Sequence, residues 1–483
     1  MPEHPSPRSQ RPSQTKIVAT VGPASTGEEC LTELIRAGVD VFRVNTAHGD
    51  RQEHQQRVDA IRQAARSQGQ PVGILVDLAG PKIRLGELPG GQLRCLVGAQ
   101  LRFVRGPNAD KPGDLVTSYE PLIDELSVGD RVMLADGTVS MIVEEIGEDY
   151  AQCRVVQSGI VRSRQGVNLP GVKLSVPTLG EVDRENARWA AAAEVDFLGL
   201  SFVRSAEEIR QLKSLIASQG SGAQVIAKIE KPEALDQLPA IVEASDGVMV
   251  ARGDLGVEID IARVAVAQKE IITTCNRLRK PVIIATQMLD SMQHSRLPTR
   301  AEVTDVANAI LDGADACMLS AETAIGQHPC EVVEMMHRIA VATEPLYRQR
   351  PPLPGPDLNA EGVDPITEAT SYAAGRIAED LDAQMVVVAS ATGETALSLS
   401  KNRNFVPTIG VSDSEATLRR MCLYWGVIPL SGTPAGDGKE LLHHVTEWGR
   451  AAGYLDSGDR IVLLTGSDLT GTTHNMIQVH ELE

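Results

Sequence analysis

The residues best suited to chemistry lie between positions 225 and 260, in the stretch VIAKIEKPEALDQLPAIVEASDGVMVARGDLGVEID. The first segment alternates as a β-strand does, so Lys228 and Glu230 project from one face. A second strand ends in a glycine-rich turn that carries Asp254, where glycine lets the backbone approach a ligand. The two carboxylates could hold Mg²⁺ and leave positions for water and a substrate phosphate. An ordinary ion pair at a strand end accounts for Lys228 and Glu230 equally well.

The strands that carry these residues belong to a long alternation of strands and helices. We predict strands over residues 15–21, 39–45, 71–77, 196–202, 224–230, 246–252, 281–287 and 314–321. The predicted helices cover residues 28–37, 51–67, 206–218, 261–278, 300–311 and 329–342. Eight parallel strands, each with a helix, predict a closed (β/α)₈ TIM barrel of the α/β class rather than an open sheet.

Two further segments depart from this rhythm. Short alternating runs separated by Gly, Asp and Asn predict an inserted all-β domain over residues 86–177. Strands and helices alternate again in a smaller C-terminal α/β domain, whose final strand is expected at a sheet edge. The expected organisation is a disordered tail (1–14), the barrel (15–85 and 178–347), the insert (86–177), a Pro- and Gly-rich linker (348–364) and the C-terminal domain (365–483).

Composition excludes several classes of function. The chain has 483 residues, too many for one core, and its 42% hydrophobic and 23% charged residues are typical of globular proteins. A net charge of −18 argues against a nucleic-acid binder, although a local basic pocket could hold phosphate. Seven cysteines without a CxxC pair indicate neither a disulfide framework nor a zinc site. No apolar run is long enough to span a bilayer, so we expect a cytoplasmic protein without membrane contact.

Polar residues follow every strand of the predicted barrel after the first, at the end where such barrels carry their chemistry. Each of these residues alone could be a satisfied polar group at a strand end. Together they form a rim of several cations, at least three carboxylates and a hydroxyl, which suits a phosphorylated substrate with a bound metal. The rim residues are Arg43, Asn45, His48, Asp77, Lys82, Arg84, Ser201, Arg204, Lys228, Glu230, Arg252, Asp254, Thr286, Gln287, Ser320 and Glu322.

At these residues the sequence closely resembles the pyruvate kinase family, from residue 15 to the C-terminus. The matching stretches are TKIVATVGPAS, FRVNTAHG, AGPKIR, GVNLPG, SFVR, AKIEKPEAL, SDGVMVARGDLGVE, KPVIIATQMLDSM, PTRAEVTDVANAILDGADACMLSAETA and SATGETA. The resemblance implies phosphoryl transfer from phosphoenolpyruvate to ADP, with Mg²⁺ or alternatively Mn²⁺ as the cofactor. It also implies that the insert is a β-barrel lid and that the C-terminal domain is regulatory.

The resemblance assigns roles to individual residues. Lys228 would lie against the transferring phosphoryl group, and Glu230 and Asp254 would bind Mg²⁺. Backbone N–H groups of Gly253 and Asp254 would hold the substrate carboxylate, with Thr286 beside the enolate carbon. The phosphate would be reached by Arg43, and the nucleotide by Asn45, His48, Arg84 and Asp136 of the lid. Phosphoryl transfer depends on such positioning and charge neutralisation more than on covalent chemistry.

The sequence departs from the K⁺-requiring members of the family at three positions. Asn45 and Asp77 keep two of the usual K⁺ ligands, but Ala47 and Leu78 replace a Ser and a Thr that supply oxygens. Lys82 stands where those members have a Glu, and its ammonium could provide the charge of the missing ion. We therefore expect an enzyme that does not need K⁺.

The resemblance also implies regulation and assembly. The loop SATGET precedes a predicted helix, and Ser390, Thr392, Gly393 and Thr395 would hold the phosphate of an effector. A simple turn with an N-cap explains the same residues. No Trp and Arg match the second phosphate pocket of members that bind fructose 1,6-bisphosphate, which favours AMP or a sugar monophosphate. The family further implies a homotetramer.

Two other functions fit part of the sequence. An effector-binding barrel without catalysis would be expected to lose Lys228, a metal carboxylate or Thr286, and all are kept. A metal-dependent aldolase or lyase acting on pyruvate-like acids would also pair a Glu with an Asp on a barrel. It would not account for the insert with Asp136 or for the C-terminal domain.

Overall fold

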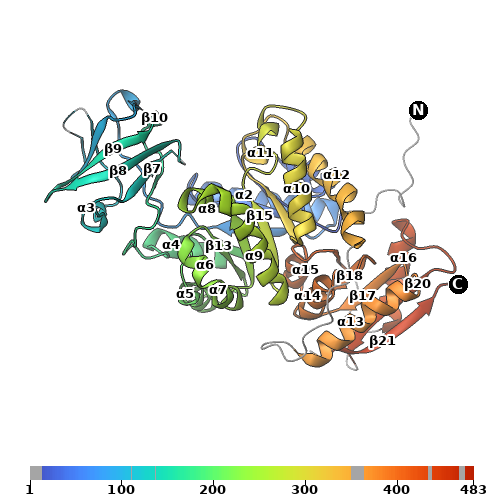
Figure 1. The fold of residues 1–483 in the computed structure, drawn as a ribbon. Helices are drawn as coiled ribbons and strands as arrows, with labels where there is room; N and C mark the ends of the chain where they lie inside the picture. Colours follow the sequence, from blue (N-terminus) through green and yellow to red (C-terminus); the bar gives the residue numbers. More distant parts are fainter. Residues whose placement is uncertain are drawn as a thin grey trace.

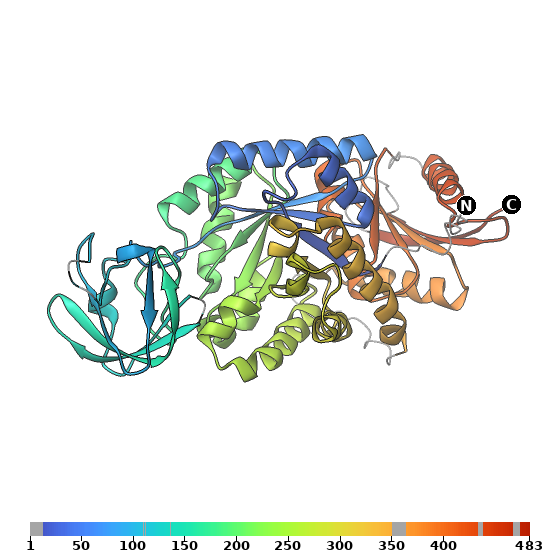
Figure 2. The ribbon, with the colours of Figure 1, turned by 90° about the horizontal axis from the view of Figure 1, so that it is seen from above.

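Three bodies lie in a row in the computed structural model: the all-β insert at one end, the barrel in the middle and the C-terminal domain at the other end (Figures 1 and 2). The structure describes residues 13–109, 111, 113–135, 137–349, 364–432, 438–466 and 474–483. The predicted tail and linker therefore fall mostly outside the described residues, and so does Asp136.

Eight parallel strands close into the predicted TIM barrel, in the order β1-β16-β15-β14-β13-β12-β3-β2. Seven of the eight have only buried residues, apart from one residue at the start of β13, as expected for apolar runs covered on both faces. The strands are β1 (Lys16–Thr20), β2 (Val41–Asn45), β3 (Gly73–Asp77), β12 (Phe197–Leu200), β13 (Gln224–Ile229), β14 (Gly247–Ala251), β15 (Val282–Ala285) and β16 (Ala316–Leu319).

Helices surround this barrel, and local capping sets several of their ends. The side chain of Asp50 caps the second helix, and Thr299 and Glu302 form a capping box at the start of α10. The helices are α1 (Glu28–Ala37), α2 (Arg51–Gln68), α4 (Glu181–Ala192), α5 (Ala206–Ala217), α6 (Pro232–Asp236), α7 (Leu238–Ala244), α8 (Arg252–Glu258), η3 (Ile261–Arg263), α9 (Val264–Arg277), η4 (Asp290–Gln293), α10 (Arg300–Asp312), α11 (Ala321–Ala324) and α12 (Pro329–Arg348).

One prediction about these helices is wrong. The glycine-rich segment after β14, predicted as a turn, forms the helix α8, and Gly253 and Gly256 in it lack positive φ angles. This difference matters for function, since it places the backbone of Gly253 and Asp254 at a helix N-terminus. The helix predicted over 261–278 is confirmed, with a 3₁₀ first turn, η3, that runs directly into α9 and is capped by the side chain of Asp260 at Ala262.

Aspartates close the amino ends of the barrel strands, opposite the rim. Four of the strands, β2, β12, β14 and β16, are each immediately preceded by an aspartate: Asp40, Asp196, Asp246 and Asp315 respectively. Each carboxylate accepts a hydrogen bond from the backbone of the neighbouring strand, at Ile17, Ile74, Val225 and Val282 respectively, over 2.8–2.9 Å. The C-terminal domain docks at this end, because Arg419 pairs with Asp196 at 2.7 Å and Lys401 with Asp315 at 2.6 Å.

The insert is an all-β domain with its own hydrophobic core. It contains a six-stranded sheet in the order β11-β7-β8-β9-β5-β6 and a two-stranded sheet of β10 and β4. Its elements are η2 (Pro89–Gly91), β4 (Gln92–Cys95), β5 (Gln100–Val104), β6 (Asp114–Leu115), α3 (Leu122–Glu125), β7 (Arg131–Leu134), β8 (Val139–Ile146), β9 (Tyr150–Gln157), β10 (Gly159–Arg162) and β11 (Val167–Asn168).

The C-terminal domain has a five-stranded sheet in the order β19-β18-β17-β20-β21, and the antiparallel β21 lies at its edge as predicted. Across the described part of the chain, no helix combines the length and hydropathy needed to cross a membrane. The elements are α13 (Pro365–Asp380), β17 (Met385–Ala389), α14 (Glu394–Lys401), β18 (Thr408–Val411), α15 (Glu415–Met421), β19 (Val427–Leu430), α16 (Gly438–Ala451), β20 (Arg460–Gly466) and β21 (His474–Glu481).

Candidate active site

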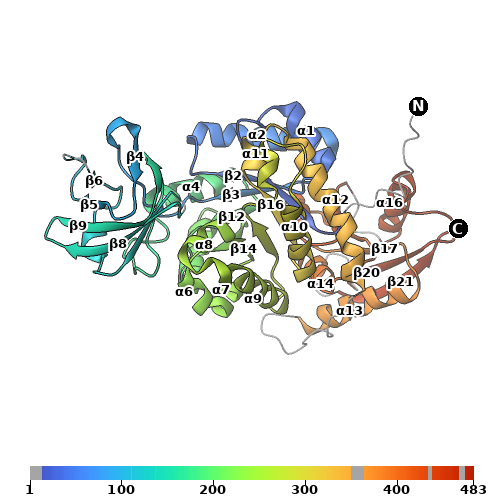
Figure 3. The same cartoon turned by 45° about the horizontal axis from the view of Figure 1, so that its top comes forward.

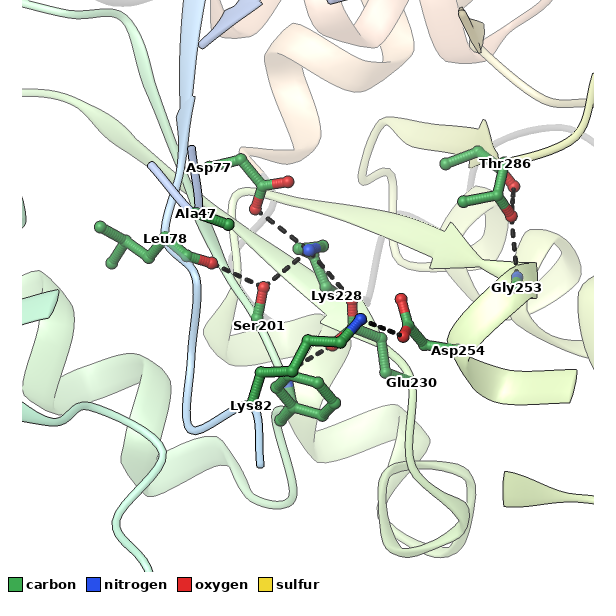
Figure 4. A network of polar contacts seen from close by, with 12 residues as sticks. Ala47, Asp77, Leu78, Lys82, Ser201, Lys228, Glu230, Gly253, Asp254 and Thr286 are labelled. Carbon is green, nitrogen blue, oxygen red and sulfur yellow. Dashed lines mark hydrogen bonds and ion pairs between the residues drawn. The ribbon is translucent and has the colours of Figure 1, made fainter. Parts of the chain in front are cut away.

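A buried lysine lies at the centre of the rim (Figure 4). The Nζ atom of Lys228 lies 3.0 Å from Glu230 Oε1 and 3.1 Å from Asp77 Oδ1, and it donates a hydrogen bond of 2.6 Å to Ser201 Oγ. Burial disfavours its ammonium form, but the charges of Asp77 and Glu230 outweigh this and raise the pKa of Lys228. The predicted alternation along β13 is thus confirmed, and Lys228 carries a permanent charge at neutral pH.

Asp77 joins two cations. Its Oδ2 atom accepts hydrogen bonds from Arg43 Nε at 2.8 Å and Nη2 at 2.5 Å, while Oδ1 faces Lys228. Burial opposes ionisation of this carboxyl, yet Lys228 and Arg43 together hold the pKa of Asp77 below its ordinary value. Arg43 Nη1 also donates to Thr20 Oγ1 at 3.1 Å, so its guanidinium plane is fixed from two sides.

The two predicted metal carboxylates differ in environment. Glu230 is 1% exposed, accepts a hydrogen bond from the backbone of Phe202 at 2.8 Å, and has a pKa raised to about 7, first by burial. Asp254 contributes to that rise through its own negative charge, and its side chain is 28% exposed. Two carboxylates that repel one another beside an open position are a suitable start for a cation site.

Glu230 and Asp254 could supply part of the coordination shell of Mg²⁺, with water and substrate supplying the rest. Within the described ranges, no group of three or more His, Cys, Asp or Glu side chains is arranged to hold a metal ion. Mg²⁺ is commonly held by one or two carboxylates, with water and substrate phosphate completing its shell. Glu230 and Asp254 meet that description, because both are oxygen donors at the carboxyl ends of adjacent strands.

Thr286 lies beside the N-terminus of α8. Its Oγ1 donates to Ala285 O at 2.7 Å and accepts the N–H of Gly253 at 2.8 Å. A Cβ atom at Gly253 would approach Thr286 Oγ1 to 3.4 Å, so the two backbones are close. Thr286 and Gln287 both have positive φ, 70° and 54°, a strained conformation often found at functional sites. The N–H of Gly253, predicted to hold a substrate carboxylate, is bonded to Thr286 in this structure.

Three of the predicted nucleotide residues follow two paired barrel strands: Asn45 and His48 lie at the end of β2, and Arg84 follows β3. Burial and then the charges of Arg84, Arg43 and Lys82 lower the pKa of His48, which places these cations around it. Asn45 Oδ1 accepts the N–H of Ala47 at 3.1 Å. Arg84 lies where the chain enters the insert and donates to Arg164 O at 3.2 Å.

Lys82 lies close to the metal carboxylates. Its Nζ atom is 3.6 Å from Asp254 Oδ1, and its side chain is 32% exposed. Leu78 is 1% exposed, so its isobutyl group packs in the core, and its carbonyl oxygen accepts a hydrogen bond from Ser201. Figure 4 shows Ala47 and Leu78 on the Asp77 side of this cluster and Lys82 on the Asp254 side.

Several rim residues do not join this cluster. Arg252 pairs with Asp305 at 2.8 Å and donates to Thr286 O, so it supports the loop after β15 from behind. Glu322 is buried and accepts backbone N–H groups of Ser320 and Leu289. Arg204 instead holds the chain segment that returns from the insert.

Sequence reasoning missed one buried carboxylate near the site. Asp183 on α4 accepts backbone hydrogen bonds from Ala79 and Gly80, in the loop that leads to Lys82. Burial raises the pKa of Asp183, and these N–H groups partly offset the effect. Its pattern in the sequence is that of an ordinary first-turn acid of a helix, so no local signal marks it.

The predicted effector loop is an ordered turn. Gly393 has φ of 91° and donates its N–H to Ser390 Oγ at 3.0 Å, and Glu394 donates to Thr392 Oγ1 at 3.4 Å. These contacts match the simple turn that the sequence left open, but the N-cap residue of α14 is Gly393, which has no side chain to cap the helix. Ser390 and Thr395 are buried, whereas Thr392 and Glu394 are exposed.

Comparisons with known proteins agree with this arrangement. The model of the family described as "Pyruvate kinase, barrel domain" matches residues 12–333, and that described as "Pyruvate kinase, alpha/beta domain" matches residues 368–480. The chain is 39% identical to a pyruvate kinase of Geobacillus stearothermophilus over 97% of this chain and 80% of that protein. It is 43% identical to pyruvate kinase 2 of Synechocystis over 94% and 77%. A crystal structure of a pyruvate kinase from Cryptosporidium parvum superposes with a TM-score of 0.89 at 33% identity, covering 99% of this chain and 97% of that one.

Proposed function

Because the chain belongs to the pyruvate kinase family and is a phosphotransferase, we propose that it transfers the phosphoryl group of phosphoenolpyruvate to ADP in cytoplasmic glycolysis. The observation that carries this proposal is the buried ammonium of Lys228, held between Asp77 and Glu230 at the rim. A fixed positive charge in a water-poor site is the main requirement for stabilising a phosphoryl group in transit.

The reaction breaks the bond between phosphorus and the enol oxygen and forms one between phosphorus and a β-phosphate oxygen of ADP. Lys228 and Arg43 neutralise charge on the phosphoryl oxygens while they are in motion. The backbone at Gly253 and Asp254 holds the substrate carboxylate at the N-terminus of α8, and this requires Thr286 to release the Gly253 N–H. The enolate left behind takes a proton at carbon on the side of Thr286, and the resulting ketone is pyruvate.

The proposed cofactor is Mg²⁺, with Mn²⁺ as an alternative, held by Glu230 and Asp254. When bound, the divalent ion would neutralise negative charge on the substrate and orient it. Asn45, His48 and Arg84 bind ADP, and Asp136 closes over it from the insert, which acts as a lid. The low pKa of His48 keeps its ring neutral, so it would act as a hydrogen-bonding group and not as a charge.

We further propose that the enzyme works without K⁺. The support is the pair of lost side-chain oxygens at Ala47 and Leu78, together with an ammonium at Lys82 that lies 3.6 Å from Asp254. An alkyl group cannot replace the hydration of a monovalent ion, whereas a tethered ammonium supplies the charge directly.

Regulation by a phosphorylated effector at Ser390, Thr392, Gly393 and Thr395 is a further part of the proposal. AMP or a sugar monophosphate is the expected effector. Its phosphate must compete with the internal hydrogen bonds of the turn and with the exposed charge of Glu394. Titration of AMP and of hexose monophosphates against the phosphoenolpyruvate saturation curve tests this, and a curve that none of them shifts rejects it.

Release of pyruvate from phosphoenolpyruvate and ADP, measured in a coupled assay with Mg²⁺, tests the main proposal. We expect turnover that depends on both substrates and stops when the divalent ion is chelated. Absence of turnover from a folded protein would overturn the proposal and leave the effector-binding barrel. Cleavage of pyruvate-like acids without ADP would instead favour the aldolase or lyase.

A further inference from the structure

We propose that Ser201 is a positioning residue for Lys228, an inference that rests on the function proposed above. Ser201 directly follows β12 and is 1% exposed. Its strand pairs with β13 through Leu200 and Ala227, which brings Ser201 level with Lys228. Lys228 Nζ donates to Ser201 Oγ over 2.6 Å, the shortest of the contacts that Lys228 makes in this cluster (Figure 4).

The hydroxyl of Ser201 can act only as an acceptor toward Lys228. Its single proton is donated to the carbonyl oxygen of Leu78 at 2.7 Å, so its lone pairs face the ammonium. Asp77 and Glu230 form ion pairs with the ammonium at 3.1 and 3.0 Å, whereas Ser201 accepts a hydrogen bond from it. Ser201 therefore sets the direction of one N–H bond of Lys228.

Ser201 differs from the other two acceptors because it carries no charge. Asp77 and Glu230 hold Lys228 but also cancel part of its charge, and both have other partners. Asp77 is shared with Arg43, and Glu230 is a proposed metal carboxylate. A neutral hydroxyl fixes the ammonium without reducing the field that it directs at a phosphoryl group. Ser201 and Asp77 are thus the contacts that Lys228 keeps if Glu230 binds another ligand.

The surroundings of Ser201 leave it little freedom to move. Gly80 has φ of 69°, and a Cβ atom built there would lie 2.9 Å from Ser201 Cβ and 2.7 Å from the Phe202 ring. Phe202 has φ of 55°, and its N–H is bonded to Glu230. The end of β12 is thus packed closely against the loop that carries Gly80.

The test compares Ser201→Ala with Ser245→Ala. Ser245 is also fully buried in the barrel, and its hydroxyl likewise donates to a backbone carbonyl, that of Val242 at 3.0 Å. The nearby ammonium of Lys280 donates to the backbone carbonyl of Ser245 at 2.7 Å, so Ser245→Ala leaves that contact in place. For Ser201→Ala we expect kcat to fall about 10- to 100-fold, the cost of a misplaced charge in the transition state. The KM values for phosphoenolpyruvate and ADP should change little, because binding uses other groups. Ser245→Ala should keep the wild-type kcat.

A third variant, Ser201→Cys, replaces the hydroxyl by a larger thiol that is a weaker acceptor, and we expect an intermediate kcat with unchanged KM values. It also decides the question if Ser201→Ala does not fold. A kcat for both Ser201 variants within about twofold of that for Ser245→Ala would overturn the inference, and so would an equal loss in all three. If the wild-type protein forms no pyruvate, the proposed function fails before Ser201 is tested.

Discussion

The charges of the cluster around Lys228 balance before any substrate binds. Arg43, Lys82 and Lys228 supply three cations, and Asp77, Glu230 and Asp254 supply three carboxylates, linked by ion pairs of 2.5–3.6 Å. A phosphorylated carboxylic acid brings more negative charge than this neutral cluster can accept. A divalent cation entering with the substrate restores the balance, which is the electrostatic reason that the proposed reaction needs Mg²⁺.

Replacement of Lys228 by methionine separates its catalytic role from a structural one. We expect kcat to fall about 10²- to 10³-fold, because the lost charge acts mainly in the transition state. The thermal unfolding midpoint should fall only slightly. Asp77 keeps Arg43, and Glu230, with a pKa already raised to about 7, can become neutral.

Steady-state kinetics and calorimetry of Lys228→Met check this expectation. Near-normal turnover by a folded variant would rule out the assigned role of Lys228. A large loss of stability with turnover per folded molecule retained would favour the simple ion pair.

We expect independence from K⁺ to depend on Ala47, Leu78 and Lys82. In tetramethylammonium buffer at constant ionic strength, added KCl should leave the turnover of the wild-type protein unchanged, because Ala47 and Leu78 offer no side-chain oxygens. Lys82→Glu should slow the reaction, since it replaces the ammonium 3.6 Å from Asp254 by a repelling carboxylate, and should gain some response to K⁺. Strong activation of the wild-type protein by KCl would contradict this prediction.

At this scale the sequence predicted side chains that share a strand better than those that meet across strands. Alternation alone places Lys228 and Glu230 on one face. The contact between Lys228 and Ser201 depends on the register of β12 against β13, and the contact between Lys82 and Asp254 depends on the course of a loop. The local sequence pattern contains no information on that register or on the course of that loop. The resemblance to a family indicated which residues belong to the site but not which atoms bond.

Among the elements, the segment that returns from the insert to the barrel forms hydrogen bonds with both of these domains. The carbonyl oxygens of Leu174 and Val176 accept hydrogen bonds from Arg204 at 2.8 and 3.0 Å. Between them, Ser175 donates its N–H and hydroxyl to Glu125 of the lid helix α3. Consecutive residues are thus fixed alternately to the barrel and to the lid. Rotation between these two attachments would move the lid as a unit.

We therefore expect Arg204→Ala to weaken nucleotide binding more than substrate binding. The variant loses the two hydrogen bonds to the returning segment, of about 1 kcal/mol each, together with the contacts of Arg204 with Thr178 and Glu208. It should raise the KM for ADP about 5-fold or more, because the insert is no longer held in register. The KM for phosphoenolpyruvate should change by less than that. Arg210→Ala on α5, the helix that begins two residues after Arg204, removes only an exposed ion pair with Glu207, and should leave both values unchanged. Equal changes in both KM values for Arg204→Ala would reject a hinge role.

Element boundaries followed from the sequence where one periodicity dominated. The bounds of α1 agree with those predicted and those of α2 differ by one residue, since glycine or a polar loop borders each amphipathic run. The helix α8 was not predicted, because two glycines in seven residues normally oppose a helix. In β19, Pro429 interrupts the apolar run and is tolerated because the strand lies at the sheet edge.

At the scale of the whole molecule, the lid and the C-terminal domain occupy opposite ends of the barrel (Figure 3). The helix α14 begins at the predicted effector loop and ends at Lys401, which lies 2.6 Å from Asp315 at the base of β16. Arg403 adds a second contact to the same carboxylate at 3.1 Å. An effector would therefore act on the barrel through one short rigid element and a fully buried ion pair, which offers a physical route for regulation.

Exposed apolar side chains near the start of α9 are candidates for the subunit contacts of the expected tetramer. Ile261 and Val266 there are 74% and 65% exposed, and Val341 and Leu346 on α12, a helix separated from α9 by α10, are 43% and 56% exposed. Exposed hydrophobic residues that lie close together commonly mark contacts between subunits. The fold of one chain gives them no partner in the part of the molecule that the structure describes.

Val266→Glu tests whether the surface at the start of α9 forms contacts between subunits. A carboxylate there would be buried without a partner in the assembled protein, which costs several kcal/mol per site, so we expect the tetramer to dissociate into smaller species. Val182→Glu provides the matched control, because Val182 on α4 is 70% exposed on a helix that lacks such neighbours. Light scattering after size-exclusion chromatography at micromolar concentration distinguishes the species. A wild-type protein that is already monomeric would refute the assembly, and a tetramer that tolerates Val266→Glu would move the contact to another face.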